Sequence, residues 1–346
     1  MKKNYFMLAL ASMMMAACAN NDLVDEGVVK EEVPQAIGFD AFANKTTRAE
    51  MDNNLTELKR TGFKVWGYKS HDTYTYTVFN GVSVTWRVDG NSSQWGYDNT
   101  QYWDQTATYD FYAVAPTDDK SSIANGKITI KDVQSSIAAN SKDYLIDRAG
   151  NTNIQGSAKE TQSFDFNHIM AKLSFVLEAA AEIEEPITVT SLKMTGWNNA
   201  EGTFTQSLIQ TPQSTSHNEW ELETPAADGV FEIVSSNLPI ASSGTKVANE
   251  YIVVPQTIKY TAPVAATDAN AGTPESGLTF TISYVIGTDV TKGEVFTEQV
   301  GIVPEDQIWG TDTHTTYTII VGPAAIKFNV SSVAGWKTAN GSTTID

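Results

Sequence analysis

The sequence predicts a mainly β fold of β-sandwich type, with one short helix near the N-terminus. Only 18% of the 346 residues are charged, whereas Thr, Ser, Asn, Gly and aromatic residues are plentiful, and this composition suits strands and turns better than helices. Short stretches of β-forming residues recur with turn residues between them, and few stretches have a helical period. Such a density of short strands is typical of β-sandwiches.

The first eighteen residues have the form of a lipoprotein signal peptide. Lys2 and Lys3 precede the apolar run Tyr5–Met15, which is far shorter than the roughly 20 residues that span a bilayer. The run ends at Ala16-Ala17-Cys18, where small residues before a cysteine suit lipid modification. Cys18 is the only cysteine, so it has no partner for an intramolecular disulfide. We predict lipidation at Cys18; the alternative is ordinary cleavage with Cys18 incidental.

The charge balance argues against one class of partner. The chain carries 23 Lys and Arg against 41 Asp and Glu, for a formal net charge of −18. Such a surface repels phosphate backbones, so we expect no binding to nucleic acid. The length suits one large or two medium domains.

Residues 19–48 are predicted as an acidic leash followed by a strand. Residues 19–35 are polar and acidic, which favours a flexible connection between lipid and folded body. Within 36–44, Ile37, Phe39 and Ala41 alternate with Gly38, Asp40 and Phe42. This alternation predicts a strand with one apolar face.

Residues 49–180 are predicted as the first domain. It begins with a short helix over Glu50–Lys59, with Leu55 and Leu58 on one side. Strands follow at Phe63–Tyr68, Tyr74–Phe79, Val82–Trp86, Tyr109–Val114, Ile128–Val133 and Phe164–Leu177. Asn80-Gly81 is a strong hairpin signal between two of these strands.

Residues 181–346 are predicted as the second domain, because the acidic, Pro-containing stretch Glu178–Pro186 is the best candidate boundary. Its predicted strands are Ile187–Met194, Tyr251–Val254, Leu278–Ile286, Val295–Val303, Thr316–Val321 and Ile326–Val330.

No motif indicates an enzyme, a metal site or a cofactor site. The four histidines (His71, His168, His217 and His314) have no zinc spacing, and no cysteine could assist them. Nucleophile-elbow, Walker and dinucleotide-binding motifs are absent from the sequence. A carboxylate pair for sugar hydrolysis is defined by separation in space, which the sequence does not give.

An aromatic cluster is the one candidate contact with a ligand. Trp86, Trp95, Tyr97, Tyr102 and Trp103 crowd into a segment rich in Gly, Ser and Asn. Aromatic rings in such loops can stack on sugars or anchor a partner on a host or bacterial surface. The alternative is core packing near a sheet end.

Short motifs over nearly the whole chain carry a family resemblance. They are the Cys18 lipobox, the acidic leash, Thr46–Ala49, Gly62–Tyr68, Tyr102-Trp103, Tyr109–Ala113, His168–Phe175, Tyr317–Ile319 and a terminal strand reaching Trp336. In this order they resemble the fimbrillin family, the type V pilins of Bacteroidetes. The resemblance implies two transthyretin-like β-sandwich domains in tandem.

The resemblance also implies a route of assembly. A lipoprotein precursor at the outer membrane would be cut by an arginine-specific surface protease between Arg48 and Ala49, with Arg148 as the main competing site. Loss of the first strand would open a groove, and the C-terminal strand of a neighbouring pilin subunit would fill it to build a cell-surface fimbrium.

The candidate donor strand lies near the C-terminus. Ile326, Phe328 and Val330 alternate with polar residues, so one face is apolar. A donated strand of this kind satisfies the backbone of a sheet edge and places alternate side chains in pockets. The same pattern also fits an ordinary strand of its own domain. A shaft or tip pilin is therefore our first interpretation, and an outer-membrane, lipid-anchored glycan-binding protein is the alternative.

Overall fold

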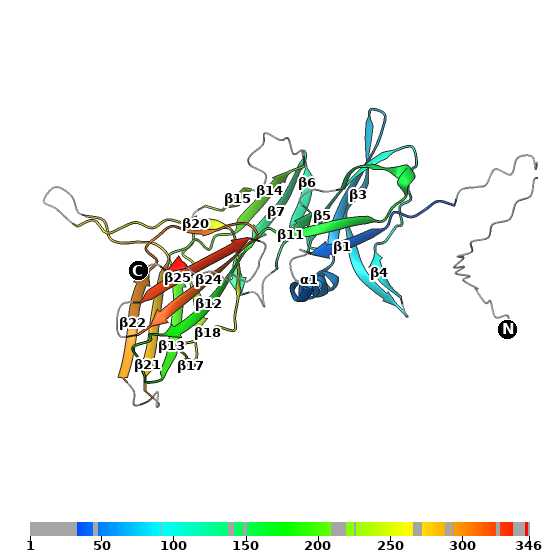
Figure 1. The fold of residues 1–346 in the computed structure, drawn as a ribbon. Coiled ribbons are helices and arrows are strands. Elements are labelled where there is room, and N and C mark those ends of the chain that lie inside the picture. Colours follow the sequence, from blue (N-terminus) through cyan, green and yellow to red (C-terminus); the bar gives the residue numbers. More distant parts are fainter. Residues whose placement is uncertain are drawn as a thin grey trace, which may run out of the picture. The chain divides into compact units, whose positions relative to one another are not determined.

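Strands dominate the computed structural model, which describes residues 33–43, 48–90, 92–137, 142–147, 151–208, 219–224, 226–265, 272–287, 291, 294–322, 326–334 and 343–344 (Figure 1). Among these residues α1 (Arg48–Thr61) is the one α-helix. Gly62, with φ +67°, ends α1, and its N–H donates to Leu58 O. No helix in the described part is long and apolar enough to cross a membrane.

The first sheet has eight strands. In spatial order these are β1 (Phe39–Ala43), β11 (Gln162–His168), β9 (Leu145–Asp147), β5 (Thr108–Ala115), β2 (Phe63–His71), β3 (Tyr74–Asp89) and β4 (Ser92–Gly96), with β10 (Asn151–Gln155) beside β5. The pairing of β1 with β11 is parallel and the other pairings in this sheet are antiparallel.

One face of this sheet packs into an aromatic-rich core. Alternating residues of β5 and β11 point into it, as the period of two in a strand requires. Leu58 of α1 also contributes and is 1% exposed. We call this set the N-terminal core: Ile37, Phe39, Ala41, Leu58, Phe63, Val65, Phe79, Val84, Trp95, Trp103, Ala107, Tyr109, Phe111, Ala113, Ala115, Leu145, Phe164 and Phe166.

A β-sandwich forms from two further sheets. One contains β26 (Thr343–Thr344), β25 (Lys327–Ala334), β24 (Thr313–Val321), β12 (Ala171–Ala179), β19 (Tyr251–Val253) and β8 (Ser136–Ile137), with β18 (Thr245–Lys246) beside β12. The other contains β16 (Phe231–Val234), β13 (Ile187–Thr195), β21 (Thr279–Ile286) and β22 (Glu294–Ile302), with β17 (Leu238–Ile240) beside β13. Phe175, Phe280 and Tyr317 pack between them in one core cluster.

Smaller sheets complete the fold. One contains β15 (Glu219–Leu222), β14 (Gly202–Ser207), β7 (Lys127–Val133) and β6 (Ser121–Ala124), and another pairs β20 (Gln256–Ile258) with β23 (Gln307–Trp309). The short helix η2 (Gly156–Ala158) follows β10. Phe204 of β14 packs in a third cluster with Trp66 and Val114, which face away from the N-terminal core.

The mainly β fold class with a short N-terminal helix is confirmed. The expected domain boundary follows directly after β12, yet β12 pairs with β19 and β24 of the later sheet. Strand β12 and residues 121–133 thus combine with elements beyond residue 186. The division at residue 180 stays a prediction.

Two local predictions were wrong. Asn80-Gly81 forms no hairpin turn, because β3 runs through it and Gly81 is the extra residue of a bulge, with φ +65°. A Cβ at Gly81 would lie 3.2 Å from the Trp66 ring. The hairpin turn lies instead between His71 and Tyr74. The predicted strand Phe164–Leu177 is two strands, β11 and β12.

Candidate functional site

Residues 35–43 fill a groove at the edge of the first sheet. Figure 1 shows β1 (blue) alongside β11 (green). On one side Phe39 to Ala43 pair with Gln162 to Phe166. On the other side Ile37 N–H donates to Gln101 O, and Trp103 N–H donates to Gln35 O. The first half of the segment is therefore hydrogen-bonded along one edge, to residues 101–103, and the second half along the other edge, to β11.

The inward side chains of this segment are buried. Ile37 is 1%, Phe39 6% and Ala41 2% exposed. Each fully buried large apolar side chain contributes about 1.5–3 kcal/mol to stability relative to its exposed state. Burial of Ile37 and Phe39 together therefore contributes about 3–6 kcal/mol to holding the segment in place.

Phe39 occupies an aromatic box. Its ring centroid lies 5.2 Å from Phe79, 5.5 Å from Tyr97, 5.8 Å from Phe111 and 5.7 Å from Phe164. These separations are those at which edge-to-face and offset-stacked rings attract. The box comes from four strands or loops that are distant in the sequence, so it forms only once the sheet is assembled.

Tyr97 also fixes the backbone of the segment. Its hydroxyl donates to Ile37 O at 2.7 Å and accepts a hydrogen bond from Gln101 N–H at 3.3 Å. Burial raises the pKa of Tyr97, so the hydroxyl stays protonated and able to donate. Tyr97 was predicted as a ligand contact instead, and the alternation of residues in a strand does not show which distant hydroxyl reaches a carbonyl.

The predicted cleavage site lies at the start of α1. Residues 44–47 are outside the described part, and Arg48 and Ala49 are the first two residues of the helix. Their side chains are not described. The predicted lipid site Cys18 and the competing site Arg148 also lie outside the described residues.

The candidate donor strand pairs within its own chain in this structure. β25 runs antiparallel to β24, from Lys327 opposite Ile320 to Ala334 opposite Thr313. Phe328 is 4% exposed, and its ring centroid lies 5.3 Å from that of Phe280. Ile326 and Val330 are only partly buried against the same core.

The aromatic residues predicted as ligand contacts pack in the N-terminal core or against it. Trp95 is 8% and Trp103 7% exposed, and Trp86 packs edge-on against Trp95 at 5.2 Å. The Nζ of Lys59 lies over the Trp86 ring at 4.0 Å. Trp86, Trp95, Tyr97 and Trp103 therefore form core contacts. Tyr102 is the one member of the predicted aromatic cluster that is largely exposed.

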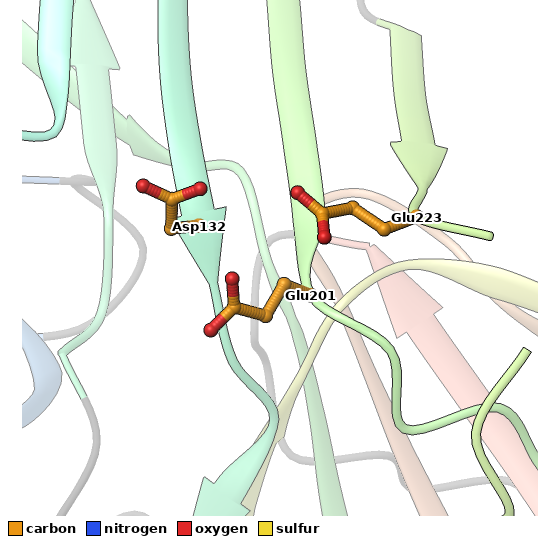
Figure 2. A group of neighbouring side chains, drawn as sticks. All are labelled: Asp132, Glu201 and Glu223. Atoms are coloured by element: carbon orange, nitrogen blue, oxygen red, sulfur yellow. The ribbon is translucent and has the colours of Figure 1, made fainter. Parts of the chain in front are cut away.

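Three carboxylates gather at one end of β7, β14 and β15. Figure 2 shows Asp132 of β7 beside Glu201 and Glu223, which lie next to the ends of β14 and β15. One oxygen of each lies within 4.8 Å of the others, and Gln134 donates to Glu201 at 2.6 Å. Asp132 and Glu223 are exposed, so water screens their charges and the cluster by itself assigns no metal.

The described histidines have polar partners. His168, 1% exposed, has Nδ1 2.6 Å from Asp143, and His314 has Nε2 2.8 Å from Ser174. These contacts suit structural hydrogen bonds. His217 lies outside the described residues.

Comparisons with known proteins give one family match and several solved structures of low sequence identity. The fimbrillin-like family matches residues 47–336, and no curated protein matches. A candidate cell adhesion protein from Bacteroides uniformis is 14% identical, with a TM-score of 0.48 over 88% of this chain and 99% of that one. One from Bacteroides ovatus is 12% identical, with a TM-score of 0.46 over 89% and 100%. A fimbrial assembly protein from Parabacteroides distasonis is 9% identical, with a TM-score of 0.35 over 85% and 95%.

The family match defines the class of the protein. It covers most of the 346 residues and corresponds to a pilin-like subunit. The chain belongs to the fimbrillin-like family. The family expected from the sequence motifs is therefore confirmed.

Proposed function

We propose that this chain is a shaft or tip subunit of a cell-surface type V pilus, with a structural and adhesive rather than an enzymatic role. It is made as an outer-membrane lipoprotein anchored through Cys18. An arginine-specific surface protease then cuts between Arg48 and Ala49. The matured subunit joins other pilin subunits by strand exchange.

The observation that carries the proposal is the groove-filling segment 35–43. Its inward side chains are 1–6% exposed, although the segment lies at the edge of the sheet. The first arginine in the chain, Arg48, follows only five residues after Ala43. A cut there separates the whole segment from the rest of the fold.

The surroundings of the segment support its role as a removable strand. Its backbone partners lie at residues 101–103 and 162–166, far along the chain. After a cut at Arg48, only hydrogen bonds and side-chain packing hold it. Its loss leaves an unpaired edge on β11 and an empty aromatic box, and such an exposed edge pairs readily with another strand.

Arginine-specific proteolysis of the purified precursor tests this function. We expect a ladder of polymers, and we expect the matured chain to begin Ala49-Glu50-Met51 on N-terminal sequencing. The matched control is Arg48→Lys, which keeps the positive charge and removes the arginine, so it should give neither the new terminus nor the ladder. A first cut after Arg148 with Arg48 intact, or complete cleavage that leaves only monomers, would contradict the proposal.

A further inference from the structure

Strand β3 has a long stretch of free edge. Along Tyr74–Val84 one edge of β3 pairs with β2, whereas β4 covers the other edge only along Thr85–Asp89. No strand of the described part pairs with that other edge of Tyr74–Val84. Side chains from residues 98–101 line a cleft beside Val78–Ser83, so Tyr74–Thr77 is the open part of the edge.

This open edge lacks the usual protection. Folded proteins protect edge strands with charge, proline, bulges or short length, because an open edge pairs with other chains. Other edge strands here follow that rule: β15, β16 and β22 contain glutamate, and β4 and β6 have five and four residues. In contrast, Thr73–Trp86 contains no charged residue and no proline. Bulges at Val78 and Gly81 interrupt the edge only beyond Thr77.

The side chains of the open edge suit pairing with another strand. All four residues are exposed, with Tyr74 at 67% and Tyr76 at 53%. The period of two in a strand puts the two tyrosines on one face of β3, and Thr75 and Thr77 on the other. Tyrosine and threonine both favour strands, and aromatic pairs and threonine pairs across neighbouring strands stabilise a sheet.

The turn before β3 sets which backbone groups are open. The two-residue turn Asp72-Thr73 joins β2 to β3. The alternation of an antiparallel pair then turns the N–H and C=O of Thr75 and Thr77 away from β2. These groups are in position to pair with a further strand.

We propose that Tyr74–Thr77 pairs antiparallel with the same residues of a second copy of this chain around a two-fold axis, with Tyr76 facing Tyr76 of the partner subunit. In this register Thr75 lies opposite Thr77 of the partner subunit, so the outward N–H and C=O groups of both residues gain partners. This inference goes beyond the proposed function, because the pairing joins subunits side by side and needs neither cleavage nor the groove.

A second copy is the partner that this edge fits. Pairing around a two-fold axis sets the same stretch opposite itself, so one edge supplies both the donors and the acceptors. Each chain has a formal net charge of −18, so two copies repel each other, and an uncharged edge lets them meet without a close pair of like charges. Four residues on each side form a small interface, so the pairing is reversible and depends on concentration.

Sedimentation of the uncleaved Cys18→Ala chain over a range of concentrations measures the pairing. We expect a monomer–dimer equilibrium. Tyr76→Lys sets two ammonium groups opposite each other in the dimer and should weaken dimerisation at least about tenfold, and Thr77→Lys, on the same open edge, should also weaken it. The matched control Thr85→Lys adds the same charge at an exposed position of β3 that β4 covers, so it should leave dimerisation unchanged.

Single cysteines test the register, because Cys18→Ala removes the only native cysteine. Tyr76→Cys lies on the two-fold axis, where facing Cα atoms are about 4.5 Å apart and within reach of a disulfide. The control Tyr74→Cys is exposed on the same face but lies about 14 Å from its counterpart. We expect mild oxidation to give disulfide-linked dimers with Tyr76→Cys and at least about tenfold fewer with Tyr74→Cys.

The other outcomes overturn the inference. A chain that stays monomeric at every concentration does not pair through this edge. Dimers that neither Tyr76→Lys nor Thr77→Lys weakens use another surface, and equal or stronger cross-linking by Tyr74→Cys excludes the register. None of these results bears on the proposed function, because the groove-filling segment stays in place in the uncleaved chain and the polymer ladder after proteolysis tests that function separately.

Discussion

Phe39→Ala in the uncleaved chain tests how firmly the groove holds its strand. Phe39 is 94% buried and has four aromatic neighbours within 5.8 Å, so its truncation empties the box. Removal of a buried phenylalanine ring costs about 3–5 kcal/mol, because packing and transfer free energy are lost together. A loss of about 3 kcal/mol raises the open population of the segment on the order of 100-fold.

Hydrogen exchange of a peptide covering residues 35–43 measures this opening. We expect exchange of that peptide to accelerate on the order of 100-fold in Phe39→Ala. Asp40→Asn is the control: it lies on the same strand with its side chain outside the core and should change stability by less than about 0.5 kcal/mol. After cleavage at Arg48 and removal of the N-terminal peptide the two chains are identical, so their unfolding curves must coincide. Unchanged exchange in Phe39→Ala would refute the reasoning that side-chain packing holds the segment.

Three further predictions concern anchoring, the donor strand and pH. Cys18→Ala should abolish incorporation of a fatty-acid analogue, and label retained by this variant would place lipidation elsewhere. Phe328→Asp buries an unpaired carboxylate, so the uncleaved chain should melt several degrees lower; an unchanged melting temperature would show that β25 does not dock in its own sheet. Burial raises the pKa of Glu250, but hydrogen bonds from Lys172 and Lys246 outweigh it and bring the pKa to about 2. Because this pKa is lowered in the folded state, ionised Glu250 stabilises the fold fully above its ordinary pKa of 4.5, and this stabilisation is lost as the pH falls towards 2. The free energy of unfolding should therefore exceed that of Glu250→Gln by about 1 kcal/mol after solvent screening, and thermal unfolding should show this difference vanish between pH 4.5 and 2.

Local pattern predicted the strands well and their connections less well. The alternation in Tyr109–Val114 led directly to β5, because a half-buried strand imposes a period of two. The hairpin turn predicted at Asn80-Gly81 was wrong because a glycine with positive φ fits a bulge as well as a turn. Which role it takes depends on the partner strand, here β2 with Trp66 packed against Gly81, and that contact is not local in sequence.

The candidate site shows the same limit. The sequence identified the apolar face of residues 37–41, since alternation reveals which side chains share a face. It did not identify the lining of the groove. Phe164 pairs with Ala41 across more than a hundred residues, and the Tyr97 hydroxyl reaches Ile37 O from a loop. The sequence also shows the aromatic cluster between Trp86 and Trp103, but composition alone does not separate core rings from exposed ones.

The parallel pairing of β1 explains why one cut could change the competition for the groove. A parallel neighbour cannot be joined by a tight turn, so β1 and β11 are linked only through the long chain between Ala43 and Gln162. Before cleavage this tether keeps β1 at an effective concentration in the millimolar range beside its groove, far above that of a strand from another subunit. A cut at Arg48 removes the tether without altering the box around Phe39. The released peptide keeps the lipid on Cys18 but is no longer linked to the matured subunit, so in the proposed scheme β1 competes for the groove as a separate molecule rather than as a tethered one.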